Sequence, residues 1–172
     1  MVVWIDDLAR RTATRLTFKN RARYPLWSPD GRQIVFTTDP DLYTKAASGA
    51  GEEEPLFQSP DNKNSQDWSA DGKYLMYATA ATTALRVLPM TGDRKPFPYL
   101  QSEANTMQAR FSPDGRWVVY TSNESGTQEA MFAHFRPMRT AAGNGSFRVA
   151  ADINRAGGVT EKRSSTSTPR TA

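Results

Sequence analysis

Cysteine is absent from this chain of 172 residues, and histidine occurs only once, at His134. A disulfide framework and a thiolate metal site are therefore excluded, and a zinc site has almost no ligands available. No run of about 18 apolar residues is present, so this segment is not predicted to insert into a membrane. Residues 1–7 have neither a basic n-region nor a long apolar h-region, so they are not predicted to be a signal peptide.

Most of the chain also lacks an excess of basic residues, although the calculated pI is 9.5. Seven of the 22 basic residues but only two of the 18 acidic residues lie from Arg136 onward. The first 135 residues hold 15 basic and 16 acidic residues and are nearly neutral. A phosphate-binding surface needs clustered positive charge, so no nucleic-acid partner is predicted.

What the sequence does contain is a turn that recurs three times, each time after an aromatic residue and before an apolar run. The copies are Trp27–Gly31, Trp68–Gly72 and Phe111–Gly115, and their aspartates lie 41 and 43 residues apart. Proline presets φ, aspartate can accept a hydrogen bond from the backbone ahead of it, and glycine takes the left-handed conformation that closes a tight hairpin. The predicted structural turn residues are Pro29, Asp30, Gly31, Asp71, Gly72, Pro113, Asp114 and Gly115.

Strands are expected on both sides of each turn. The apolar runs at 33–37, 74–78 and 117–121 are continuous rather than alternating, which is typical of strands covered on both faces. Third strands are expected at 41–44, 84–88 and 129–133, and fourth strands at 55–57 and 95–97. Residues 3–8 and 14–18 fit the third and fourth strands of the same pattern.

A repeat with a period near 42 residues indicates stacked propeller blades. The fold class predicted is all-β: a partial β-propeller of about three blade equivalents, each a four-stranded antiparallel sheet, with an irregular C-terminal tail. The predicted units are 1–22 (second half of a preceding blade), 23–63 (blade), 64–106 (blade), 107–135 (partial blade) and 136–172 (a disordered or out-of-frame basic tail).

The segments 27–37, 68–78 and 111–121 resemble the TolB-like, or WD40-like, β-propeller repeats of bacteria. In that family an aromatic-Ser-Pro-Asp-Gly turn precedes an apolar strand; Ala70 departs from the pattern by replacing proline. The stretch 94–126 more particularly resembles the C-terminal propeller of large acidobacterial-type serine/threonine kinases. The kinase motifs themselves are absent from this sequence, so the resemblance implies no kinase activity.

The tail from residue 136 lacks strand periodicity, and its coding sequence gives a second interpretation. We back-translated the tail and read its possible codons in the frame that starts one base earlier. In that frame the codons allow the sequence Trp-Arg-Arg-Asp-Gly near position 160, which resembles the repeated turn and lies about one period after Asp114. We therefore hypothesise that the chain is a fragment whose reading frame shifts after about residue 135.

Few residues of this sequence are candidates for catalysis or ligand binding. Asp30, Asp71 and Asp114 sit in turns at the repeat period, so turn formation explains them better than acid–base or metal chemistry. Asp39 with Asp41, and Asp6 with Asp7, lack the loop of a calcium site. The aromatic pair Trp27 and Trp68 is explained by core packing better than by stacking on sugars or single-stranded nucleic acid. No catalytic, cofactor-binding or metal-binding residue is predicted.

The function favoured by this resemblance is a non-enzymatic interaction or sensor module, a fragment of a larger bacterial signalling protein such as a propeller-bearing serine/threonine kinase. Two alternatives stay open: a TolB-type periplasmic scaffold that binds other proteins, and the gating propeller of an α/β-hydrolase peptidase. The sequence does not identify the protein or small-ligand partner, and resemblance alone favours a periplasmic location. Because propellers close with 4–8 blades, open blade faces are also expected to drive self-association.

Overall fold

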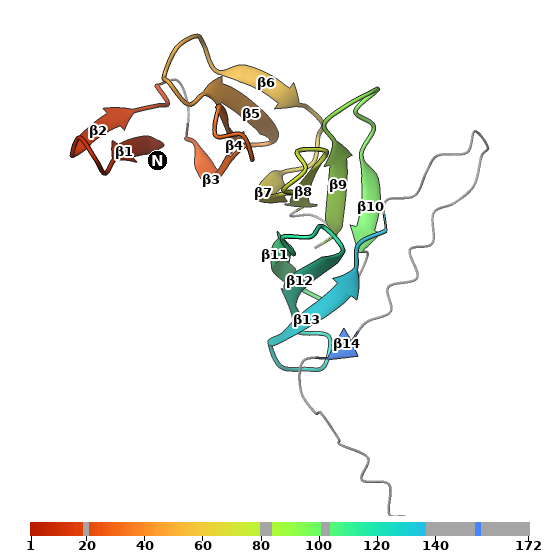
Figure 1. Ribbon diagram of the computed structural model, residues 1–172. Helices are drawn as coiled ribbons and strands as arrows, with labels where there is room; N and C mark the ends of the chain where they lie inside the picture. Colours follow the sequence, from red (N-terminus) through yellow and green to blue (C-terminus); the bar gives the residue numbers. More distant parts are fainter. Residues whose placement is uncertain (19–20, 80–83, 101–103, 137–153, 156–172) are drawn as a thin grey trace, which may run out of the picture.

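The computed structural model describes residues 1–18, 21–79, 84–100, 104–136 and 154–155, and the regular structure in these ranges consists of β-strands. A hairpin and three four-stranded sheets follow one another along an arc (Figure 1). No helix in the described ranges is long and apolar enough to cross a membrane. The all-β, blade-like fold class is thus confirmed.

The strands are short. The hairpin consists of β1 (Trp4–Asp7) and β2 (Thr12–Arg15). The first sheet contains β3 (Arg23–Trp27), β4 (Gln33–Thr38), β5 (Asp41–Ala46) and β6 (Glu54–Phe57). The second contains β7 (Lys63–Trp68), β8 (Tyr74–Thr79), β9 (Leu85–Pro89) and β10 (Phe97–Leu100). The third contains β11 (Thr106–Phe111), β12 (Trp117–Ser122), β13 (Glu129–His134) and β14 (Asn154–Arg155).

Each four-stranded sheet is an antiparallel meander in which neighbours in sequence are neighbours in space. The first strands of the sheets, β3, β7 and β11, pack against one another on the concave side of the arc (Figure 1). Later strands lie progressively farther out. This arrangement gives the molecule one concave surface made of first strands and one face made of the repeated turns.

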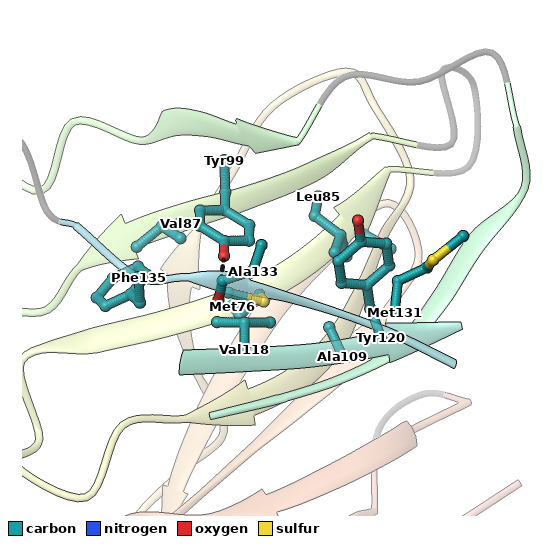
Figure 2. Packing of buried hydrophobic residues seen from close by; sticks show 11 residues of the cluster. Met76, Leu85, Val87, Tyr99, Ala109, Val118, Tyr120, Met131, Ala133 and Phe135 are labelled. Carbon is teal, nitrogen blue, oxygen red and sulfur yellow. Dashed lines mark hydrogen bonds between the residues drawn. The ribbon is translucent and has the colours of Figure 1, made fainter. Parts of the chain in front are cut away.

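Successive residues of β4 and β8 are buried, because these two second strands are covered on both faces. On β4, Ile34 and Phe36 pack in a cluster with Val3 and Leu16 of the hairpin region. The residue between them, Val35, faces the other way and packs with the second sheet. A third cluster joins the second and third sheets, whose side chains point toward one another in Figure 2. Its buried members are Met76, Ala78, Leu85, Val87, Tyr99, Ala109, Val118, Tyr120, Met131, Ala133 and Phe135.

The outer face of the last sheet lacks such a cover. Val119 holds the position on β12 that Val35 holds on β4 and Met76 holds on β8. Val119 is 44% exposed, whereas Val35 and Met76 are both 0% exposed. Burial on both faces is therefore complete for the inner sheets only.

Several expectations about single strands need correction. The fourth strand of the second sheet is β10, at Phe97–Leu100 rather than at 95–97. The first strands lie before each turn, as expected, and each contains a register shift typical of a β-bulge. The third sheet gains the short strand β14, which the sequence did not predict. The tail that the frameshift hypothesis concerns falls mostly on 137–153 and 156–172, outside the described residues.

Candidate functional site

The three repeated turns have the same geometry. The glycines have φ values of 69° (Gly31), 74° (Gly72) and 67° (Gly115), and the amide of each donates to the carbonyl of the turn serine at 2.8–2.9 Å. Glycine tolerates this left-handed conformation because it lacks a Cβ. The structure therefore places all eight predicted turn residues in hairpin turns between first and second strands.

The aspartates accept hydrogen bonds within their own turns. Oδ1 of Asp30 accepts from the Ser28 hydroxyl at 2.6 Å and from the Arg32 amide at 3.0 Å. These two bonds lower the pKa of Asp30, and the Asp114 turn repeats the same pattern. For Asp71, burial acts to raise the pKa, but the Ser69 hydroxyl and the Lys73 amide outweigh it and the net shift is downward. All three carboxylates are thus held ionised.

The turn serines are structural parts of each turn that the sequence analysis did not include among the turn residues. The hydroxyl oxygen of Ser28 accepts the Gln33 amide at 2.9 Å while its proton goes to Asp30. Ser69 and Ser112 make the equivalent bonds to Tyr74 and Trp117. Their presence at the same place in all three copies was the available signal.

Clefts separate successive turns. The larger cleft, of about 440 Å³, lies between the first two turns and is lined by Ser28, Pro29, Asp30, Gln33, Trp68, Ala70, Asp71 and Gly72. The smaller, of about 150 Å³, lies between the second and third turns. In the larger cleft the indole nitrogen of Trp68 donates to the Gly72 carbonyl at 3.1 Å, which fixes the ring.

The two repeat tryptophans do not share one environment. Trp68 packs against the cluster between the first and second sheets, as expected of a core residue. Trp27, by contrast, is 54% exposed, so the core interpretation is wrong at this position. The physical reason is that the preceding element is the two-stranded hairpin, which has no turn of the repeated kind to cover Trp27.

The concave surface carries two non-glycine residues in the left-handed region. Tyr24 (φ 52°) and Gln108 (φ 56°) sit at the bulges of β3 and β11, three residues before the repeat aromatic in each case. Bulges of this kind re-aim a side chain. Both side chains are exposed, so they lie on the solvent-facing part of the inner strands.

The buried Lys63 binds the segment that connects the first and second sheets. The ammonium of Lys63 is 0% exposed and donates to Asp41 Oδ1 at 3.1 Å. It also donates to the backbone carbonyls of Pro40, Ser59 and Asp61 at 2.8–2.9 Å. Because β7 begins at this lysine, the cage fixes where the second sheet starts. No repeat feature marked it in the sequence.

The remaining candidate residues have structural roles. Asp39 pairs with Arg23, and Asp7 accepts from the amides of Ala9 and Arg10 in its own turn. His134 ends β13 and stacks on Trp117 with ring centroids 3.5 Å apart. Among the described residues no three His, Cys, Asp or Glu side chains gather as a metal site requires.

Comparison with known proteins agrees with this architecture. Residues 1–62 match the family model of the dipeptidyl peptidase IV (DPP IV) N-terminal region. Over these residues, which form the hairpin and the first sheet, the chain is similar to that region, and the fold of the sheets is that of β-propeller blades. The chain is also 29% identical over 110 residues to the uncharacterized peptidase YuxL of Bacillus subtilis (strain 168), a match that covers 64% of this chain and 16% of YuxL.

Solved structures share the fold at low sequence identity. TolB from Acinetobacter baumannii superposes with a TM-score of 0.64 at 17% identity, over 77% of this chain and 35% of TolB. The tricorn protease gives a TM-score of 0.57 at 15% identity, over 75% of this chain and 15% of that protein. The chain thus spans about a third or less of YuxL, of TolB from Acinetobacter baumannii and of the tricorn protease. The kinase-linked resemblance gains no support from these matches.

Proposed function

We propose that this chain forms part of the propeller that gates the catalytic domain of an α/β-hydrolase peptidase. The observation that carries the proposal is the match of residues 1–62 to the dipeptidyl peptidase IV N-terminal region. The similarity to YuxL, whose name describes a peptidase, points to the same class of protein. This was one of the alternatives to the sensor module favoured from the sequence.

In this role the chain acts through its shape, and the catalytic domain supplies the nucleophile. The stacked sheets form a rigid wall, and the concave surface of first strands faces the space through which a peptide substrate would pass. Rigid elements suit such a wall because their buried cores resist deformation. Specific contacts then come from side chains placed on the concave surface and on the turns.

The experiment that tests the proposal is to read the coding sequence on both sides of this segment in all three frames. A gating propeller predicts a downstream Gly-x-Ser-x-Gly elbow followed by aspartate and then histidine. In addition, a fluorophosphonate probe should label the natural protein captured with an antibody against residues 1–135. His-Arg-Asp and Asp-Phe-Gly motifs upstream, with no labelling, would instead establish a kinase-linked propeller. A signal peptide upstream with neither domain would identify a TolB-type scaffold.

A further inference from the structure

The cleft between the first two turns differs from its counterpart between the second and third turns, although the backbone that frames both is the same. In each turn the serine amide donates to the carbonyl of the residue that opens the second strand: Gln33 in the first sheet and Tyr74 in the second. These two residues are therefore equivalent in the repeat. The clefts beside them measure about 440 and 150 Å³.

Aromatic side chains close the smaller cleft. Tyr74 meets Phe135 edge-to-face with ring centroids 5.3 Å apart, and Phe135 meets Phe111 in the same way at 4.9 Å. The equivalents of Tyr74, Phe135 and Phe111 in the larger cleft are Gln33, Met90 and Trp68. Of these, only Trp68 is aromatic, and Met90 packs into the cluster between the first and second sheets and does not line the cleft. The first cleft is therefore larger because two of the three aromatic residues that close the smaller cleft are replaced there. Its volume is in the range typical of small-ligand sites, roughly 300–1,000 Å³.

The lining has two chemical parts. Pro29, Ala70 and the fixed indole of Trp68 supply apolar surface. Asp30 and Asp71 supply two carboxylates whose pKa values are lowered. An aliphatic stem that ends in a cation matches both parts, since the stem covers apolar surface and tryptophan is the best aromatic partner for a cation.

The positive charges already present leave room for such a ligand. Lys73 pairs with Asp71 Oδ2 at 3.2 Å, but its side chain is 62% exposed, and exposed pairs of this kind contribute little. Arg32 lowers the pKa of Asp30 through space, while no salt bridge to Asp30 occurs within the described part of the chain. A ligand cation can therefore displace Lys73 at small cost.

We propose that this cleft binds a basic side chain, lysine or arginine, of a partner polypeptide. The proposal stands apart from the proposed function, because it needs only the two neighbouring turns. The ligand's aliphatic stem lies against Trp68 and Pro29, and its cation reaches Asp30 and Asp71.

The test uses the full chain labelled with 5-fluorotryptophan, which gives one ¹⁹F signal for each of its four tryptophans. The Trp68 signal is assigned with Trp68→Phe, and the probes are Nα-acetyl-lysine amide, Nα-acetyl-arginine amide and, as neutral control, Nα-acetyl-norleucine amide. We expect the basic probes to shift the Trp68 signal saturably in the millimolar range. Asp30→Asn should weaken their binding by about threefold, because it removes one of two charges but keeps the turn acceptor.

Two variants separate binding from turn stability. Asp114→Asn makes the same change in a turn that does not line the cleft, and it should leave binding unchanged. Gln33→Tyr should abolish binding by restoring the aromatic that the next repeat carries. Equal shifts with norleucine, no saturable shift with either basic probe, or equal losses for Asp30→Asn and Asp114→Asn would each overturn the proposal.

Discussion

Replacing Gly31 by valine isolates the energetic contribution of the repeated turn. Gly31 has a φ of 69°, and a Cβ built on it meets no atom within 4 Å. The substitution therefore creates no steric clash with neighbours at Cβ. Its cost comes from holding an L-residue in the left-handed region, roughly 1–2 kcal/mol and more for a β-branched side chain.

Part of this cost is offset in the unfolded state, because removing glycine reduces the entropy of the unfolded chain by about 0.4–1 kcal/mol. The net destabilisation of Gly31→Val should be about 1 kcal/mol or more. For a chain of this size that lowers the melting temperature by roughly 2–4 °C per kcal/mol. The assay is equilibrium urea unfolding, followed by circular dichroism, with a thermal melt in parallel.

The matched control is Gly31→Asn, since asparagine tolerates the left-handed region better than other residues with a side chain. We expect it to lie between the wild type and the valine variant. Gly115→Val should repeat the effect in the third turn, where φ is 67° and the space is also open. The reasoning fails if both valine variants unfold at the same urea concentration as the wild type.

Three further predictions concern other parts of the chain. Burial raises the pKa of the Tyr99 hydroxyl above its ordinary 10.0. The stability that the neutral hydroxyl contributes is therefore complete below pH 10 and is lost as the pH rises above 10. Tyr99→Phe should reduce the fall in the free energy of unfolding above pH 10, measured by urea unfolding at a series of pH values. Lys63→Met should cost about 3–5 kcal/mol in urea unfolding because Asp41 loses its buried partner, while the exposed control Lys73→Met should change stability by less than about 1 kcal/mol. Sequencing of the coding DNA should reveal an altered base count near codons 134–137; a clean frame in homologues with the same tail would refute the frameshift hypothesis.

The sequence predicted the parts of the fold that repeat. Turn residues such as Asp30 and Gly31, and apolar runs such as that of β4, recur at one period, so each copy supports the others. Continuous apolar runs also indicated burial on both faces, which holds for β4 and β8. At β12 the exposure of Val119 follows from what covers the sheet and not from the strand itself.

Structural features that occur only once could not be predicted from the repeat pattern. The cage around Lys63 brings together residues 2 to 23 positions away, and no pattern in the sequence marks them as neighbours. The exposure of Trp27 depends on the missing turn of the preceding element. The open cleft did leave a signal, because Gln33 is polar where Tyr74 and Trp117 are aromatic in the other two repeats.

The central claim is that successive four-stranded sheets stack as propeller blades, and an engineered disulfide tests it most directly. The Thr37 and Ser65 hydroxyl oxygens lie 3.3 Å apart in the buried contact between the first and second sheets. The chain has no cysteine of its own, so Thr37→Cys with Ser65→Cys introduces the only two thiols. Stacking predicts an intramolecular disulfide after mild oxidation of the monomer, identified by mass spectrometry of its proteolytic peptides. Free thiols, or disulfides formed only between chains, would contradict the account.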